Sequence, residues 1–600
     1  MGDKFFIKSS YLISTKNIIT ILICTWPVTS IWAKVPKVSD IENYIVEAEA
    51  CSFKGPFKII VGSNTAKRTY LHLPAGTQSG AELPSLKCSF NVEQSGFYEV
   101  KLLIRTAKCK NNLFTVKLEH KSFSYNIREA RDWRYRNIPE LFYLNKGEHE
   151  LFLHPLCDDI KIDKIIMVYD PIFQESGQDL TPPFEMPSIE FPVFPECEFK
   201  ISDFGGVSDG TTKNTEAFRR AIQACANAGG GKVVVPAGKW LTGPIHLKSN
   251  VNLHLEKGAV VFFSTDVEDY LPAVFTRWAG FECYNYSPLI YARDCENIAI
   301  TGQGKFYGQG QFWWYMFERQ SENAQLLYKQ VLDNIPPEKR IYATKEDGFR
   351  PQFFAPINCR KILLEDVSFY SGPFWTVHLI YCEHVHARRL KFITEGPNND
   401  GLNCDSCRNV LVEYCYFNTD DDALAIKSGI NEDGWRVGRP SENIIIRHCR
   451  SSGSRWGGIS FGSDTSGGIK NVFIHDVHFA DTRSSLYLKS TRGRGGTVED
   501  IFIQNIEISG QDNKPIKIDT KYRAWFGSDD GVAPIFRNIN ISNLKAREVR
   551  QAMYIQGLPE QPLENIKLQN ISILDAQESA HLANVSNLTI DNLSISLKDD

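Results

Sequence analysis

The chain has 600 residues, which is more than one ordinary hydrophobic core holds, so two or more domains or a long repeat array are expected. With 42% hydrophobic and 23% charged residues, its composition excludes a disordered, collagen-like or coiled-coil protein. The net charge of −4 provides no overall positive field for nucleic acid.

The N-terminus has the order of a secretory signal peptide. Three lysines precede a short apolar run at 18–24, and the small residue Ala33 follows at a suitable cleavage point. The run is too short to span a bilayer, and no later apolar run is long enough to do so. An uncleaved signal anchor is the alternative. We therefore predict a signal peptide over 1–33 and a protein that is secreted, periplasmic or on the cell surface.

Residues 40–172 contain short strands of alternating polarity, such as 96–104 and 148–153, without a fixed period. This pattern predicts a small antiparallel β-sandwich. The segment resembles carbohydrate-binding modules of the jelly-roll type at Glu47-Ala48-Glu49 and at Ile162-Asp163. Such modules carry structural calcium there, so the resemblance implies a calcium site, with solvated carboxylates as the alternative. A proline-rich linker is expected over 173–197.

From residue 198 to 600 a phrase recurs, in which a turn and an Asn or Asp precede a strand of alternating apolar residues. Most steps are roughly 22 to 29 residues, the period of a β-solenoid coil. One coil cannot bury its own apolar face, but stacked coils share a core. The asparagines are expected to form a turn ladder. We predict an all-β protein in which a right-handed parallel β-helix follows the smaller sandwich. The phrase occurs at 294–298, 358–362, 381–385 and 406–410, and it returns at Asn443, Asn471, Asp500, Asn538, Asn565 and Asn587.

The sequence contains 15 cysteines, several of them at equivalent points of this phrase. Cysteines in register are typical of a column of small buried side chains, and we expect no disulfide on which activity depends. Two other segments depart from the phrase. Residues 217–228 are expected to form a short amphipathic helix that caps the first coil, and 316–349 a loop over the groove.

Acidic residues cluster in two short segments, 397–401 and 419–423. Asp400 and Asp421 are 21 residues apart (421 minus 400), about one coil, so we expect their carboxylates side by side. Like charges at such a distance raise the pKa of at least one carboxyl group. A protonated acid beside an ionised base is what glycoside hydrolysis requires. Composition alone leaves a calcium site or an ordinary acidic turn equally open.

The segment from about 198 to 595 resembles the polygalacturonases (glycoside hydrolase family 28), especially their exo-acting branch. The resemblance implies a parallel β-helix and inverting hydrolysis of an α-linked, usually galacturonic, sugar. It implies Asp421 as the general acid, Asp400 and Asp422 as the residues that hold and deprotonate the attacking water, and Lys489 as the ligand of a substrate carboxylate. The matching stretches are Arg350-Pro351, Ser371-Gly372-Pro373-Phe374-Trp375-Thr376-Val377-His378, Asn398-Asn399-Asp400-Gly401-Leu402, Asp421-Asp422-Ala423-Leu424-Ala425-Ile426-Lys427-Ser428-Gly429, Gly438-Arg439-Pro440-Ser441-Glu442-Asn443-Ile444 and Lys489-Ser490-Thr491-Arg492-Gly493-Arg494-Gly495-Gly496.

This chain departs from the family pattern at three places. Arg455-Trp456-Gly457 replaces Gly-His-Gly, Tyr487-Leu488-Lys489 replaces Arg-Ile-Lys, and Asp420 replaces the glycine before the Asp pair. Losing the arginine removes a bidentate carboxylate contact that lysine alone does not reproduce. These changes argue against a plain polygalacturonan substrate. A branched or mixed pectin is then an alternative substrate, and a relative with weak catalytic activity is an alternative for the protein itself. An acidic glycan stays our first expectation.

Several further residues are expected near the substrate. Trp456 is expected to stack on a sugar face, and His378 to contact the substrate or else to pack in the core. The complete set of predicted substrate-binding residues is Lys489, Asn398, Trp456, Tyr487, Arg455, Arg492 and His378.

The sequence therefore predicts an exo-acting pectic glycosidase without a catalytic metal or cofactor. Its expected partner is a pectic oligo- or polysaccharide, with no nucleic acid, no membrane span and a monomeric state. A non-catalytic glycan-binding β-helix is one alternative, and a pectate-lyase-type polysaccharide lyase that uses calcium is another.

Overall fold

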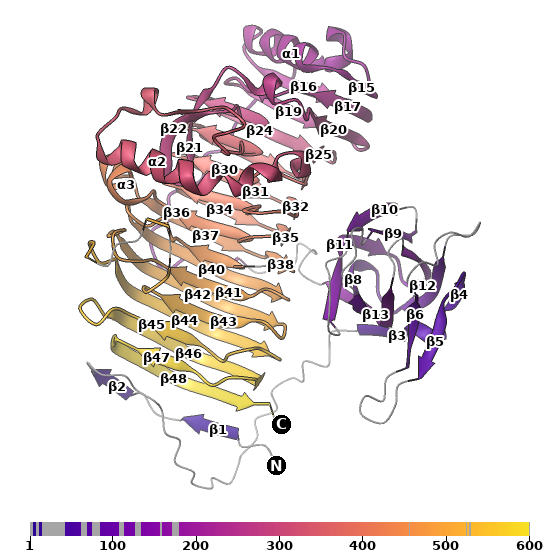
Figure 1. Ribbon diagram of the computed structural model, residues 1–600, viewed down its shortest axis with the longest axis vertical. Coiled ribbons are helices and arrows are strands. Elements are labelled where there is room, and N and C mark those ends of the chain that lie inside the picture. Colours follow the sequence, from indigo (N-terminus) through magenta and orange to yellow (C-terminus); the bar gives the residue numbers. More distant parts are fainter. Residues whose placement is uncertain are drawn as a thin grey trace. The chain divides into compact units, whose positions relative to one another are not determined.

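The computed structural model describes residues 4–7, 11–14, 43–61, 69–74, 84–106, 113–119, 121–126, 134–155, 159–170, 179–454, 456–523, 525–526 and 530–598. The chain forms two compact units, one over 23–177 and the other over 178–600 together with 1–22 (Figure 1). Each unit has its own hydrophobic core.

The smaller unit consists of two antiparallel sheets whose inward-facing residues form one core. Strand β7, for example, alternates strictly between buried and more exposed positions, as expected for a strand with one face on a core. A disulfide joins Cys51 to Cys88. The first sheet has the order β10 (Lys121–Asn126), β9 (Leu113–Leu118), β12 (Gly147–Pro155), β7 (Ser85–Val92), β4 (Ser52–Lys54), and the second β11 (Arg134–Leu144), β8 (Gly96–Thr106), β13 (Ile160–Asp170), β6 (Thr69–Leu73), β5 (Lys58–Val61), with β3 (Asn43–Glu47) beside β13.

The larger unit is a right-handed parallel β-helix, which confirms the predicted fold class (Figure 1). One of its faces is an 11-stranded parallel sheet to which each coil adds one short strand. In chain order the strands of this sheet are β18 (Ile245–His246), β23 (Ile290–Arg293), β27 (Phe354–Ile357), β30 (Val377–Ile380), β33 (Leu402–Asp405), β36 (Leu424–Lys427), β39 (Ile459–Phe461), β41 (Ser484–Lys489), β43 (Lys514–Asp519), β45 (Tyr554–Gln556) and β47 (His581–Ala583).

The other strands of the coils pair in parallel as well, and strands β1 and β2 lie antiparallel to β48. Their bounds are β1 (Lys4–Ile7), β2 (Tyr11–Ser14), β14 (Glu198–Lys200), β15 (Asp209–Lys213), β16 (Gly231–Val235), β17 (Gly238–Thr242), β19 (Val251–Leu255), β20 (Ala259–Phe263), β24 (Glu296–Gly302), β25 (Lys305–Tyr307), β28 (Arg360–Glu365), β29 (Ser368–Tyr370), β31 (Glu383–Arg388), β32 (Lys391–Thr394), β34 (Arg408–Glu413), β35 (Tyr416–Thr419), β37 (Ser441–Arg447), β38 (Arg450–Ser452), β40 (Ile469–Ala480), β42 (Thr497–Ser509), β44 (Ile535–Arg547), β46 (Leu563–Ala576) and β48 (Val585–Leu597).

Asparagine ladders hold the turns between strands, as predicted. Asn471 donates its side-chain amide to Asn443 at 3.0 Å, and Asn443 donates in turn to Asn409 at 3.1 Å. Each of these residues has a positive φ of 54 to 57°, a conformation that asparagine tolerates better than most residues. Because each side chain bonds to the equivalent residue of the next coil, the ladder fixes the register of the stack.

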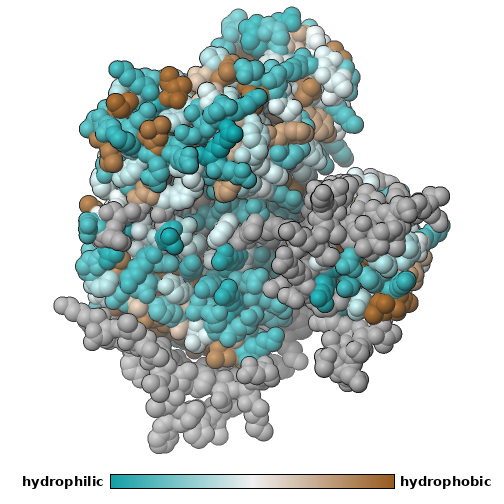
Figure 2. Space-filling view, in the orientation of Figure 1, coloured by the Kyte–Doolittle hydropathy of each residue, from teal (hydrophilic) through white to brown (hydrophobic). Residues whose placement is uncertain are grey.

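The core of the β-helix is made of columns of like residues. Phe306, Phe369, Phe392 and Phe417 stack in succession, with ring centroids 4.8 to 5.6 Å apart. The cysteines of the repeated phrase are free and buried, which confirms their prediction as packed side chains: Cys295, Cys359, Cys382 and Cys407. Outside this core, the face turned to the viewer in Figure 2 is mostly hydrophilic with scattered apolar residues.

Helix α1 (Thr215–Asn227) packs on the first coil and buries Phe218 and Ile222, so the predicted cap is confirmed. The segment 316–349 was expected to be a loop, but it contains helix α2 (Gln320–Leu332), because Ala324, Leu327 and Val331 share one apolar face. This helix packs against an inserted sheet of β21 (Val274–Trp278), β22 (Phe281–Asn285) and β26 (Ile341–Tyr342), near helix α3 (Asn431–Val437).

Of the predicted signal peptide, only strands β1 and β2 fall within the described residues. The described part of the linker, residues 179–197, has no helix or strand. Glu190 attaches it to the β-helix through ion pairs with Arg360 at 2.5 Å and Lys361 at 3.2 Å. Among the described residues, no helix is long and apolar enough to cross a membrane.

Candidate functional site

Two coils of the 11-stranded sheet bring the predicted aspartates together. Asp400 precedes β33, and Asp421 and Asp422 precede β36. The register pairs Leu402 with Leu424, so Asp400 lies opposite Asp422 rather than opposite Asp421. A backbone hydrogen bond of 3.0 Å from Gly401 to the Asp422 carbonyl fixes this alignment. Parallel pairing thus places three carboxyl groups on adjacent coils.

The three carboxyl groups differ in their access to solvent. Asp400 and Asp422 are each 2% exposed, whereas Asp421 is half-buried. Oδ1 of Asp422 is buried and has no hydrogen-bond partner among the residues that the structure describes. A Cβ atom added at Gly457 would lie 2.4 Å from this oxygen, so glycine is needed for the backbone to approach it this closely. An unpaired buried carboxylate oxygen is costly, and it is typical of a functional site.

Two lysines neutralise part of this negative charge. Lys489 Nζ lies 2.8 Å from Asp422 Oδ2, and Lys427 Nζ lies 3.9 Å from Asp400 Oδ2 and 3.6 Å from Asp464 Oδ2. The Lys427 ammonium also lies 4.3 Å from the ring centroid of Trp375. Neither Lys427 nor Asp464 was predicted from the sequence as a site residue. Lys427 is the last residue of β36, the strand that directly follows the Asp pair, and this proximity in sequence was the available signal.

The environment shifts the titration of these groups. Burial, and then the neighbouring Asp422 charge, raise the pKa of Asp421 to about 7 against the opposing effect of Lys489 and Lys427. Burial and the charge of Asp421 also raise the pKa of Asp400 well above its usual range. Burial lowers the pKa of Lys489, but Asp422, Tyr522, Tyr487 and Asp421 together outweigh it, so the pKa is raised. The site therefore combines carboxyl groups of raised pKa with a carboxylate that is paired to a lysine, within one cluster.

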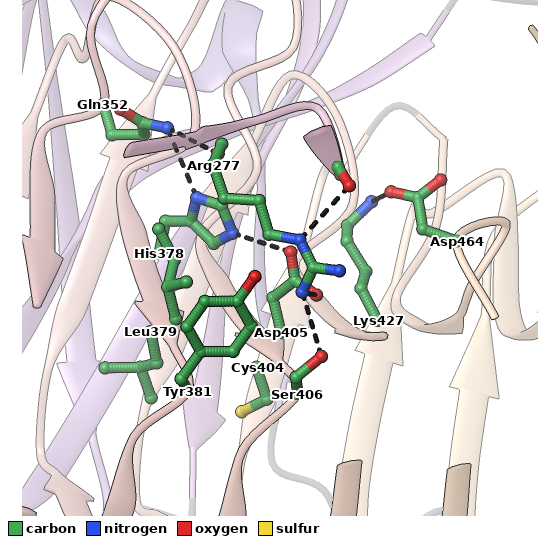
Figure 3. Close-up of polar contacts among 12 residues, drawn as sticks. Arg277, Gln352, His378, Leu379, Tyr381, Cys404, Asp405, Ser406, Lys427 and Asp464 are labelled. Carbon is green, nitrogen blue, oxygen red and sulfur yellow. Dashed lines mark hydrogen bonds and ion pairs between the residues drawn. The ribbon is translucent and has the colours of Figure 1, made fainter. Parts of the chain in front are cut away.

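A buried network surrounds Asp405, at the end of strand β33 (Figure 3). Arg277 of β21 donates to Asp405 Oδ1 at 2.8 Å and to Ser406 at 2.9 Å. His378, which was predicted to contact substrate or to pack in the core, is completely buried and lies 3.2 Å from Asp405 Oδ2. Its Nδ1 lies 3.4 Å from the Gln352 amide. The structure thus places His378 in this network and away from the surface.

Asn398 links the carboxylates to the insertion. Its Oδ1 accepts hydrogen bonds from Arg350 at 2.8 Å and from Gln320 of α2 at 3.3 Å. Its positive φ of 55° suits asparagine. The side-chain oxygen of Asn398 is therefore engaged by protein groups, and residue 398 holds α2 beside the chain that leads to Asp400.

The other predicted substrate-binding residues come from parts of the chain that follow the Asp pair. Trp456 is 44% exposed, and the Arg483 guanidinium lies 4.5 Å from its ring centroid. Arg492 binds Glu560 at 2.6 Å. Tyr487 was predicted to contact substrate but is only 4% exposed, because Lys489 and Lys517 lie over its ring at 4.8 and 4.2 Å. Arg455 lies outside the described residues.

One group of potential metal ligands occurs among the described residues. His448, His475 and Asp476 offer ligand atoms within 4.8 Å of one another. Asp476 already accepts hydrogen bonds from His475 at 2.6 Å and from Asn505 at 3.1 Å. His448, Asp476 and Asn505 all have positive φ and belong to a turn ladder, which accounts for their proximity.

Comparison with known proteins identifies relatives over the β-helix. The model of the glycosyl hydrolases family 28 matches residues 338–595. The chain is 30% identical to a probable polygalacturonase from Vitis vinifera over 62% of this chain and 73% of that protein. It is 24% identical to an exo-poly-alpha-D-galacturonosidase from Dickeya chrysanthemi over 66% of this chain and 71% of that protein. A hyperthermoactive exopolygalacturonase from Thermotoga maritima is similar in structure, with a TM-score of 0.63 and 34% identity over 68% of this chain and 96% of that one.

Proposed function

This chain belongs to the glycosyl hydrolases family 28, and we propose that it cleaves α-glycosidic bonds of galacturonic-acid-containing pectic polysaccharide by inversion, from chain ends. It is a glycosidase. The relatives named above are polygalacturonases and exo-acting galacturonosidases, and their substrate class fits the basic residues beside the carboxylates of this chain.

The convergence of Asp400, Asp421 and Asp422 carries the proposal. Asp421 is the most accessible of the three, and its pKa of about 7 keeps it largely protonated in mildly acidic solution. A general acid needs both properties, because it must reach the leaving oxygen and have a proton to give. We assign Asp421 this role.

Asp400 and Asp422 are assigned to the attacking water. Asp422 is paired with Lys489 through one oxygen, while its second oxygen has no partner among the described residues. That free oxygen is suited to accept a proton from water on the opposite face of the sugar ring. With one carboxyl group protonated and another ionised, water attack and leaving-group departure occur in one step, which inverts the anomeric centre.

The insertion supports action from chain ends. Helix α2 is tied to the site through Gln320 and Asn398, and Trp314 Nε1 donates to the Gly372 carbonyl at 3.1 Å. These contacts place the inserted elements on the coils before Asp400. A sugar chain is therefore expected to run from the catalytic carboxylates toward the later coils, with its end against the insertion.

Trp456 is proposed to stack on a sugar face, since its ring is exposed beside the Asp422 coil. Secretion with cleavage of residues 1–33, a monomeric state, catalysis without a metal and the calcium site in the sandwich are also proposed. Glu47, one residue of the expected calcium site, forms an ion pair with Lys164 at 2.8 Å.

A screen of pectic fragments tests the proposal. Homogalacturonan, rhamnogalacturonan and xylogalacturonan oligosaccharides are incubated with the full chain, and the products are identified by mass. We expect release of galacturonic acid from chain ends, with the first product in the inverted anomeric form by NMR. Retention of configuration, or an unsaturated product that absorbs in the ultraviolet, would contradict the inverting hydrolase.

A further inference from the structure

Two ammonium groups flank the ring of Tyr487. Lys517 on β43 is the register partner of Tyr487 on β41, so the two side chains lie on the same face of the sheet. Lys517 Nζ donates to the Tyr487 hydroxyl at 2.8 Å and lies 4.2 Å from the ring centroid. Lys489 Nζ lies 4.8 Å from the same centroid. The ring therefore stabilises both cations through cation–π contacts.

The two lysines differ in how their charge is compensated. Lys489 is buried and forms an ion pair with Asp422. Lys517 is half-buried, and it forms no ion pair with a carboxylate among the residues that the structure describes. Its one described hydrogen-bond acceptor is a neutral phenol, which leaves donor capacity on the ammonium for an anion.

The charges around Lys517 also favour the binding of an anion. Asp519 on the same strand favours its protonated form, whereas Lys514, Lys489 and Arg483 disfavour it. Together with burial, which has the largest effect, they lower the pKa of Lys517 to about 8. A carboxylate bound here would relieve the repulsion among these cations.

Lys514, the neighbouring cation on β43, is already bound to other protein groups. Its Nζ donates to Gln551 at 2.8 Å and lies 5.3 Å from the Tyr554 ring centroid. Of the two lysines on this strand, Lys517 is the one that lies next to Lys489 across Tyr487, one coil beyond the ion pair with Asp422.

We propose that Lys517 and Lys489 together bind the carboxylate of one uronic acid residue of the substrate. This is the sugar that lies beyond the cleaved bond, over the later coils that carry β41 and β43. Lys517, from the next coil, thereby supplies the second cation that is missing where Tyr487 replaces an arginine. Tyr487 is a positioning residue that holds both ammonium groups. The inference rests on the proposed function and names the residue that selects an ionised, unesterified sugar at this position.

The test compares free and methyl-esterified digalacturonate as substrates of the wild type, Lys517→Gln and Lys517→Arg. We expect Lys517→Gln to raise KM for the free acid about 10- to 100-fold, as expected for loss of one charge-assisted hydrogen bond. Activity on the ester should change little, so the preference for the free acid falls by a similar factor. Lys517→Arg should restore most of this preference. Lys545→Gln, which removes an exposed lysine on β44, is the matched control and should behave like the wild type.

A preference for the free acid that is unchanged in Lys517→Gln would overturn the inference while leaving the proposed function intact. A wild type that hydrolyses neither substrate would instead contradict the proposed function. Calorimetric binding of trigalacturonate to the same variants then decides on Lys517, since an equal affinity in wild type and Lys517→Gln would overturn its role. Thermal melting of each variant separates a loss of binding from a loss of folding.

Discussion

The ammonium of Lys489 lies 2.8 Å from Oδ2 of Asp422, while Oδ1 of the same carboxylate has no described partner. The two oxygens of Asp422 therefore have different surroundings. The lysine compensates the charge on one oxygen in this buried setting, and the other oxygen is left to bond a water molecule.

Replacing Lys489 by Met should both inactivate and destabilise the protein. The substitution leaves the buried Asp422 charge without its cation, and breaking such a pair typically lowers the free energy of unfolding by about 3 to 5 kcal/mol. Chemical denaturation of the β-helix unit measures the loss. The double variant Lys489→Met/Asp422→Asn should recover part of the stability, and a double variant no more stable than Lys489→Met would contradict the pairing argument.

Asp421→Asn should lower kcat by about 10² to 10⁴, the usual contribution of a general acid. The amide keeps the size of the side chain but has no proton to give. Initial rates on digalacturonate measure the effect, with Asp203→Asn, an exposed position near the first coil, as the control. Activity within about tenfold of the wild type would refute the role of Asp421.

The raised pKa of Asp421 also predicts how activity depends on pH. Because the acid must be protonated, kcat/KM should fall as the pH rises through about 7. A profile of kcat/KM against pH between 4 and 9 checks this. A rate that stays level to pH 9 would show that no group with this pKa acts as the acid.

The same shift predicts a pH dependence of stability. The folded state binds the Asp421 proton more tightly than the unfolded state, in which the pKa is near 3.8. Its contribution to stability is therefore full below about pH 4 and is lost as the pH rises through about 7. Relative to Asp421→Asn, the wild type should lose melting temperature over this range. Parallel curves for the two proteins would contradict the shift.

The sequence was sufficient to predict the coils and the acidic residues of the site, because both follow from local patterns. A repeated turn and strand indicates a solenoid, and a spacing near one coil brings Asp400 and Asp421 to neighbouring strands. The spacing did not give the register, however, and the backbone places Asp400 opposite Asp422.

The contacts between segments that are distant in the chain could not be predicted from the sequence patterns. Lys517 lies in a different coil from Tyr487, and only the strand register shows that it stands beside Lys489. Likewise, His378 shares the Asp405 carboxylate with Arg277, which comes from an inserted hairpin about 100 residues earlier in the chain (378 minus 277 is 101). Such pairs arise from tertiary packing and have no local signature.

Arg277→Met should destabilise the β-helix by about 3 to 5 kcal/mol, since it leaves the Asp405 carboxylate buried and uncompensated. Burial raises the pKa of Asp405, but Arg277, together with His378 and Lys427, outweighs it and lowers the pKa, so the carboxylate is charged in the folded state. Denaturant titration measures the loss. The companion variant Arg277→Met/Asp405→Asn should recover part of it, and equal losses in the single and double variants would argue against an ion pair at this position.

Removing the Cys51–Cys88 disulfide should affect the sandwich and spare catalysis. The bond closes a loop over a sequence separation of 37, and its removal should lower the stability of this unit by about 2 to 4 kcal/mol. The carboxylates and lysines of the site all belong to the other unit. Calorimetry of Cys51→Ser/Cys88→Ser should therefore show a lower transition for the sandwich alone, with hydrolysis of soluble digalacturonate unchanged. A loss of hydrolysis of more than about tenfold would show that the β-helix depends on the oxidised sandwich.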